Sequence, residues 1–219
     1  MANEMDKEVQ DTLLTQSDEQ FMDESAVAYR LLSVLLDYPD DTNFYTMLNE
    51  LKVWLHQHDS FIPRIHSVFY RVIDQLLTID AQELAAEYVQ TFDFSETTSL
   101  YLTAHELGSG RGRGPALIEL RNLFHHYGLE EASSELPDFL PALFELLSVL
   151  PPEARPSDIE QRLARGCLEI REHLHDSSNY QSVLDAALHM LPKIDPTAER
   201  FPLYEKADTD ELPYPLMYD

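Results

Sequence analysis

The chain has 219 residues, with 40 acidic and 15 basic side chains, so its formal net charge is −25 at pH 7. A charge this negative argues against nucleic acid and anionic membrane surfaces as partners, because both would be repelled, and it is compatible with a basic partner. The single cysteine, Cys167, rules out an internal disulfide framework and a multi-thiolate metal site.

The N-terminal extension 1–24 is acidic and has neither the basic start nor the apolar run of a secretory signal. The densest apolar runs, at 31–36 and 140–150, are far shorter than the roughly 20 residues that span a bilayer. We therefore expect a soluble, cytoplasmic protein without direct membrane insertion. We expect both this extension and the acidic, proline-containing tail 193–219 to be partly disordered.

Between these ends, apolar residues recur at steps of three and four, the spacing of one helix face. Alternating strand patterns are absent, and four of the six glycines gather in 108–114. The pattern predicts one all-α domain over 25–192. Its roughly nine helices are expected at 25–37, 42–57, 62–78, 81–93, 96–107, 113–127, 137–150, 157–175 and 178–192.

Two of these helices, 25–37 and 137–150, are apolar around most of their circumference, so we expect them at the centre of the fold. Two capping boxes predict helix starts, one formed by Asp80 with Glu83 and one by Ser157 with Glu160. Cys167 lies in the apolar stripe of its helix and is expected to be a small core residue.

The nine histidines raise the question of a metal site. Their spacings place no two imidazoles on one helix face, which needs a separation of three or four residues. The dipeptides at 58–59 and 175–176, each His followed by Asp, resemble the paired ligands of helical HD-type metal-dependent phosphohydrolases. A phosphohydrolase is therefore the enzymatic alternative for the function of this chain. Histidines at the surface or at helix ends explain the same residues without a metal site.

The glycine-rich loop 108–114 carries Arg111 and Arg113 beside flexible backbone, which suggests an anion site. It fails the dinucleotide-binding fingerprint and the Walker pattern, because the third glycine and the Gly-Lys-Ser/Thr sequence are missing. Its glycines can instead end one helix and admit the next. The arginines would then pair with neighbouring acids or contact a partner.

Two segments combine aromatic and acidic side chains. In 135–139, Pro137 suits a first helical turn and the carboxylates suit the positive end of a helix dipole. In 87–93, Tyr88 and Phe92 are four residues apart and share one helix face. Both segments are explained by helix entry and core packing, and both could also form a groove for a basic peptide.

In chain order, several segments resemble the nitrate reductase molybdenum cofactor assembly chaperone family, the NarJ or delta-subunit family. They are LLSVLLDYPD at 31–40, EYVQTFD at 87–93, SLYLTAHELGSGRGRGPAL at 99–117, HHYGLE at 125–130 and SELPDFLPALFELLSVLP at 134–151. The resemblance covers roughly 25–192. The wider group of redox-enzyme maturation chaperones typically has a histidine where Phe139 stands here.

The resemblance implies an all-helical, non-enzymatic chaperone that binds the apo catalytic (alpha) subunit of nitrate reductase at its N-terminal segment. The chaperone would keep that subunit competent for molybdenum cofactor insertion before membrane attachment, and would hold no cofactor itself. A chaperone for another molybdenum oxidoreductase, such as a dimethyl sulfoxide or trimethylamine N-oxide reductase, is the alternative within the class. The oligomeric state stays open. The candidate partner-binding residues are Tyr88, Phe92, Glu135, Pro137 and Asp138, with Arg111 and Arg113.

Overall fold

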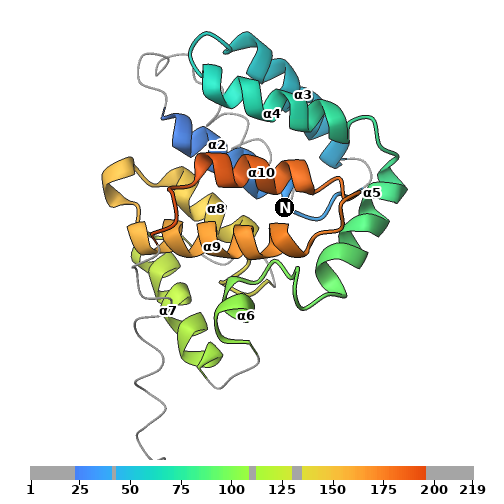
Figure 1. Cartoon of the computed structure of the whole chain (residues 1–219). Coiled ribbons are helices and arrows are strands. Elements are labelled where there is room, and N and C mark those ends of the chain that lie inside the picture. The colour runs from blue at the N-terminus through green and yellow to red at the C-terminus, as the bar shows by residue number, and fades with distance from the viewer. Residues whose placement is uncertain (1–22, 41–42, 109–111, 130–134, 196–219) are drawn as a thin grey trace, which may run out of the picture.

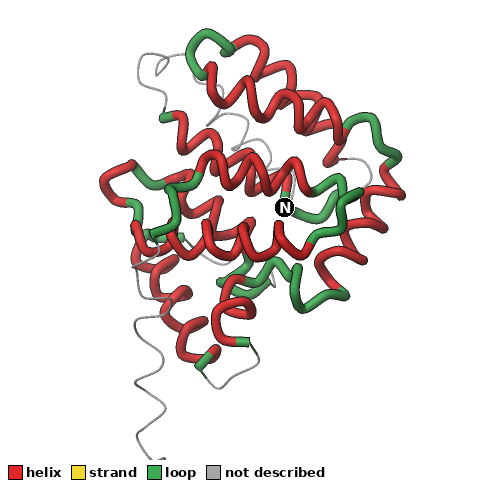
Figure 2. Tube along the Cα trace, viewed as in Figure 1, coloured by secondary structure: helices red, strands yellow, loops and turns green. Residues whose placement is uncertain are grey.

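The computed structural model describes residues 23–40, 43–108, 112–129 and 135–195. Over these ranges the chain forms nine α-helices and no strand beyond one isolated bridge, which confirms the all-α prediction (Figure 2). The two acidic ends lie almost entirely outside the described residues. The α-helices are α2 (Glu24–Leu35), α3 (Asn43–Gln57), α4 (Pro63–Leu76), α5 (Ala81–Tyr88), α6 (Leu102–Leu107), α7 (Arg113–His126), α8 (Leu140–Val149), α9 (Ser157–His173) and α10 (Gln181–Met190).

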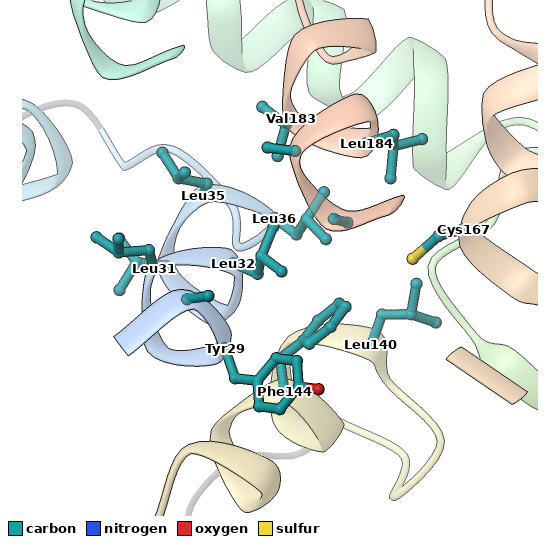
Figure 3. Close-up of a cluster of buried hydrophobic side chains, with 14 of the residues drawn as sticks. Tyr29, Leu31, Leu32, Leu35, Leu36, Leu140, Phe144, Cys167, Val183 and Leu184 are labelled. Carbon is teal, nitrogen blue, oxygen red and sulfur yellow. The ribbon is translucent and has the colours of Figure 1, made fainter. Parts of the chain in front are cut away.

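The centre of the fold is the packing of α2 along α8, with α9 and α10 laid over them (Figure 1). Both predicted central helices therefore lie where we expected them. Figure 3 shows how their side chains converge, with Phe144 of α8 beside Tyr29 of α2 and Cys167 of α9 opposite Leu140. Burying one such leucine or phenylalanine stabilises the fold by about 1.5–3 kcal/mol relative to leaving it exposed.

Two smaller units extend this core at opposite ends (Figure 1). Helices α3 and α4 form a hairpin against α2 and α10, and the α6–α7 pair packs on α9. Arg162 of α9 donates to both carboxylate oxygens of Glu106 at 2.6 and 2.7 Å, which fastens α6 to the core. Within the described ranges, no helix is both long enough and apolar enough to cross a membrane.

One of the two predicted capping boxes caps a helix in the structure, and the other does not. The Asp80 carboxylate accepts hydrogen bonds from the backbone N–H groups of Gln82 and Glu83, so that start is confirmed. The Ser157 box is wrong, because Ser157 is already helical and Pro156 is the residue that precedes the helix. The Glu160 carboxylate is occupied elsewhere, since it accepts the Tyr29 hydroxyl at 2.6 Å.

Several helices are shorter than the periodicity predicts, and two of them begin late where distant segments pair. The segment predicted at 96–107 is helical only from Leu102, and the one predicted at 137–150 begins at Leu140. In both cases the residue that immediately precedes the helix, Tyr101 or Phe139, has extended backbone, and these two residues form an antiparallel bridge with each other. A contact distant in sequence therefore replaces the local hydrogen bonds that a longer helix would make.

Candidate functional site

A cavity of about 210 Å³ opens where three distant segments meet: the end of α2, the end of α5, and the Tyr101–Phe139 bridge. Three of the candidate residues from the sequence, Tyr88, Phe92 and Glu135, line it. The full lining is Asp37, Tyr38, Tyr88, Phe92, Asp93, Leu100, Tyr101, Glu135 and Phe139.

The floor of this cavity is aromatic and continuous with the core. Tyr88 and Phe92 are each 4% exposed, and their ring centroids are 5.0 Å apart in an edge-to-face arrangement. Tyr180, fully buried beneath, meets both rings edge-on at 5.8 and 4.9 Å. The Tyr88 hydroxyl donates to the Leu36 carbonyl at 3.2 Å, which ties the floor to the end of α2. The same two rings therefore serve core packing and the cavity.

A π-helical turn, Val89–Asp93, follows α5 and carries Phe92 and Asp93 into the lining. The Phe94 N–H donates to the Val89 carbonyl at 3.2 Å, the five-residue step that defines this wider turn. The Thr98 hydroxyl donates to the Thr91 carbonyl and so satisfies a backbone acceptor of the turn. Single π-helical turns of this kind often occur at functional sites.

One wall of the cavity is built by the Tyr101–Phe139 bridge. The Leu102 N–H donates to the Asp138 carbonyl at 2.9 Å and the Leu140 N–H to the Leu100 carbonyl at 2.8 Å. The rings of Tyr101 and Phe139 lie 5.5 Å apart, centroid to centroid. The Tyr101 hydroxyl donates to Glu135 Oε2 at 2.5 Å, so the wall presents aromatic faces with a carboxylate at their edge.

Asp138 lies behind this wall and is fully buried. Its Oδ2 accepts the Thr103 N–H at 3.1 Å and the Thr103 hydroxyl, and lies 3.5 Å from Arg113 Nη2. Pro137 is also buried, and neither it nor Asp138 belongs to the cavity lining. The Arg113 guanidinium lies over the Tyr101 ring, 5.9 Å from its centroid. Arg111 lies outside the described residues.

Three carboxylates give the cavity its electrostatic character, and no lysine or arginine occurs among the described residues that line it. Lost hydration raises the pKa of Asp37, the Tyr38 N–H lowers it, and the charge of Glu135 raises it further. Lost hydration and the same Glu135 charge raise the pKa of Asp93. Burial raises the pKa of Tyr101, as does its hydrogen bond to Glu135. The cavity therefore favours a positive charge.

Exposed apolar side chains lie beside these acids in the sequence. Phe94, which follows Asp93, is 83% exposed, and Leu136, which follows Glu135, is 39% exposed. Tyr38, itself in the lining, is 48% exposed and meets Tyr88 edge-to-face at 5.4 Å. An acidic, aromatic hollow with apolar side chains beside it suits an amphipathic basic segment.

Four lining residues were not predicted from the sequence, namely Asp37, Tyr38, Leu100 and Tyr101, although all four lie in segments that carried the family resemblance. Phe139 belongs to the 135–139 segment, which was considered as part of a groove. Glu87, the acidic residue that begins the 87–93 segment, is not part of the lining. The Glu87 carboxylate instead accepts from Ser178 Oγ and from the backbone and side chain of Asn179 at 2.7–2.8 Å. That residue fastens α5 to the connection between α9 and α10.

The histidines of the phosphohydrolase hypothesis have local partners. His58 Nδ1 lies 2.8 Å from the Trp54 carbonyl, one helical turn earlier, and the ring stacks on Trp54. His175 Nδ1 lies 2.8 Å from Ser177 Oγ. Across the part of the chain that the structure describes, no three His, Cys, Asp or Glu residues lie close enough to hold a metal ion. The geometry therefore gives that hypothesis no support.

Comparison with known proteins finds similarity to nitrate reductase assembly proteins. The family described as "Nitrate reductase delta subunit" matches residues 39–180. A Bacillus subtilis protein described as a probable nitrate reductase molybdenum cofactor assembly chaperone, NarJ, is 28% identical over 165 residues, covering 75% of this chain and 86% of that protein.

The nitrate reductase molybdenum cofactor assembly chaperone NarJ of Escherichia coli strain K12 is 34% identical over 131 residues, which are 55% of this chain and 51% of that protein. Among solved structures, a redox enzyme maturation protein from Archaeoglobus fulgidus superposes with a TM-score of 0.53 at 21% identity, over 77% of this chain and 94% of that one. At this level of identity, the structural match supports the fold alone.

Proposed function

Because this chain belongs to the nitrate reductase delta-subunit family, whose members are chaperones rather than enzymes, we propose that it binds the apo catalytic subunit of a respiratory nitrate reductase. It keeps that subunit competent for molybdenum cofactor insertion until the subunit attaches to the membrane. The contact is made with the N-terminal segment of the catalytic subunit, at the acidic aromatic cavity. The chaperone holds no cofactor of its own.

The observation that carries this proposal is the composition of the cavity. Five aromatic rings and three carboxylates surround a volume of about 210 Å³. That volume is below the roughly 300–1,000 Å³ of sites for drug-sized ligands, so it fits one long side chain rather than a whole helix. A lysine or arginine placed there would meet ring faces and carboxylates together, which stabilises a cation.

The exposed apolar residues supply the second half of the contact. An amphipathic helix that inserts one basic side chain into the cavity would lay apolar residues against Phe94 and Leu136, which are 83% and 39% exposed. The net charge of −25 attracts a basic segment from a distance and speeds encounter at low salt. The same acidity disfavours an anionic, phosphate-bearing cofactor in the cavity.

Calorimetric titration with a synthetic peptide from the N-terminus of the catalytic subunit tests the proposal. We expect saturable binding that weakens as the salt concentration rises, because screening shortens the reach of the carboxylate charges. The variant Glu135→Gln should weaken binding about fivefold or more, since it removes a charge from the cavity. The control Glu172→Gln removes an exposed carboxylate of α9 that is absent from the lining, and should change affinity less than twofold.

Failure to bind at either salt concentration, repeated by a second method, would contradict the proposed contact. The same titration with leader peptides of dimethyl sulfoxide and trimethylamine N-oxide reductases tests the alternative client. We expect those peptides to bind more weakly, because the matching relatives are described as nitrate reductase chaperones.

A further inference from the structure

We propose that Asp138, Thr103 and Arg113 are positioning residues that fix the Tyr101 wall of the cavity and thereby set its affinity without touching the client peptide. The proposal rests on the proposed function for its affinity measurement. It differs from the sequence-based expectation, in which Asp138 and Arg113 were themselves contact residues.

The first step of the argument is the position of Asp138 at the start of α6. That helix begins at Leu102, and the Tyr101 side chain that precedes it makes no capping hydrogen bond. The Asp138 carboxylate supplies the missing acceptor, because Oδ2 takes the Thr103 N–H at 3.1 Å. An N-terminal N–H that would otherwise be unsatisfied is thus capped by a residue 35 positions away.

The second step is that this cap holds Tyr101 in place. Tyr101 immediately precedes the capped helix and is paired with Phe139 across the bridge. The Asp138 carbonyl accepts the Leu102 N–H at 2.9 Å, so the backbone of Asp138 binds the first residue of α6 and its side chain binds the second, Thr103. Movement of Asp138 would therefore shift the Tyr101 backbone with it.

The third step concerns Arg113, whose guanidinium lies 5.9 Å from the centroid of the Tyr101 ring. Its Nε donates to Thr103 Oγ1 at 3.0 Å, and its Nη2 lies 3.5 Å from Asp138 Oδ2. On the far edge of the ring, the Tyr101 hydroxyl is bound to Glu135. Tyr101 is thus held at its face by a cation and at its hydroxyl by a carboxylate.

The fourth step is that the three residues lie outside the cavity in which we place the client side chain. Asp138 and Thr103 are each 0% exposed, and none of the three lines the cavity. Within the described part of the chain, Asp138 Oδ1 has no hydrogen-bond partner, so the carboxylate is held through its Oδ2 atom. Removing either neighbour would weaken the hold on a buried carboxylate.

The pair Thr103→Val and Thr103→Ser tests this arrangement. Valine keeps the shape of threonine and removes the hydroxyl, whereas serine keeps the hydroxyl. We expect Thr103→Val to weaken peptide binding about five- to tenfold and Thr103→Ser to stay within about twofold of the wild type. The fluorine resonance of 3-fluorotyrosine at position 101, assigned with Tyr101→Phe, should shift in the valine variant and return in the serine variant.

Arg113→Gln is the second variant, in case the valine variant fails to fold. Its matched control is Arg171→Gln, because the Arg171 side chain is also 29% exposed, is also paired with an aspartate, and loses the same charge. We expect Arg113→Gln to weaken binding about fivefold and to shift the Tyr101 resonance. Arg171→Gln should do neither.

A cycle with Tyr101→Leu separates positioning from direct contact. If Arg113 acts through the Tyr101 ring, Arg113→Gln loses its effect on affinity once that ring is gone. An undiminished effect in the Tyr101→Leu background would show that Arg113 contacts the peptide, and would overturn the proposal.

Unchanged affinity and an unchanged Tyr101 resonance in folded Thr103→Val and Arg113→Gln would overturn it equally. The resonance is measured without peptide. A wild-type protein that binds no peptide would therefore defeat the proposed function, while the resonance alone would still decide whether these residues position Tyr101.

Discussion

The helical core and the acidic cavity share the rings of Tyr88 and Phe92 but differ in what surrounds them. In the core, apolar side chains of α2, α8, α9 and α10 pack on one another, as Figure 3 shows. In the cavity, three carboxylates face the same rings, and the pKa of both Asp37 and Asp93 is raised. The core stabilises the fold, whereas the cavity holds two carboxylates, Asp37 and Asp93, whose charged form is disfavoured in the folded state. Such charges are typical of binding sites.

The largest expected effect comes from the core. Phe144 is fully buried between α8 and α2, so Phe144→Ala should lower the free energy of unfolding by about 3–5 kcal/mol. The exposed Val149, on the same helix, provides the control Val149→Ala, which should change stability by about 0.5 kcal/mol or less. Urea denaturation followed by circular dichroism measures both. Equal effects would mean that α8 is not central.

The next largest effect is expected at the cavity, where a substitution should lower peptide affinity and leave stability unchanged. Phe94 is 83% exposed beside the cavity, so Phe94→Ala should leave the urea midpoint nearly unchanged and weaken peptide binding about fivefold. Ile118→Ala, at a 57% exposed residue of α7, is the control and should leave both quantities unchanged. A stability loss without an affinity loss would place Phe94 with the core instead.

A smaller effect tests the charges themselves. Because the pKa of Asp37 lies above its ordinary value of 3.8, the folded state binds more protons than the unfolded state between those two pKa values. The contribution of Asp37 to the free energy of unfolding therefore falls as pH rises through that interval, and this loss of stability persists at neutral pH. Asp37→Asn removes it and should raise the melting temperature at pH 7 by about 1–2 °C while weakening peptide binding.

Repeating the melting curves at pH about 3, where the carboxyl is protonated in both states, should abolish the advantage of Asp37→Asn. Asp176→Asn, at an exposed aspartate outside the cavity lining, is the control and should leave the melting temperature at pH 7 nearly unchanged. A melting temperature that falls in Asp37→Asn at pH 7 would show that this carboxylate stabilises the fold and would remove the contrast with the core.

The smallest effect expected is none at all. Burial raises the pKa of the Cys167 thiol to about 12, so hardly any thiolate exists at neutral pH. We expect a thiol reagent such as dithionitrobenzoate to react with the protein only after urea is added. Rapid reaction of the folded protein would show that α9 opens readily, and that the core is less closed than its packing indicates.

The sequence predicted the fold well because helix formation is largely local. Apolar steps of three and four mark the buried face of each helix, and Asp80 marks the start of α5 through a hydrogen bond within three residues. Prediction failed at 96–101 and 137–139, where the Tyr101–Phe139 bridge takes over the backbone. Hydrogen bonds between residues 34 or more positions apart replace the local helical hydrogen bonds there. The spacing of apolar residues along the chain does not predict such a pairing.

The candidate site was predicted in part for the same reason. Tyr88, Phe92 and Glu135 stood out as aromatic or acidic residues in motifs typical of the family, and all three line the cavity. Asp37 and Tyr101 belong to other segments, and only the fold brings them to the same place. The two acids of the 135–138 motif also separate, since Glu135 lines the cavity and Asp138 lies behind it.

By itself, then, the sequence determined the helical class, the central role of 25–37 and 137–150, the negative charge and the family. Each of these depends on composition, on spacing along one chain, or on motifs in order. Only the tertiary structure decided which acids meet one another and which face the solvent. That outcome depends on how distant segments pack, because burial and charge proximity are properties of the folded surface rather than of neighbouring residues.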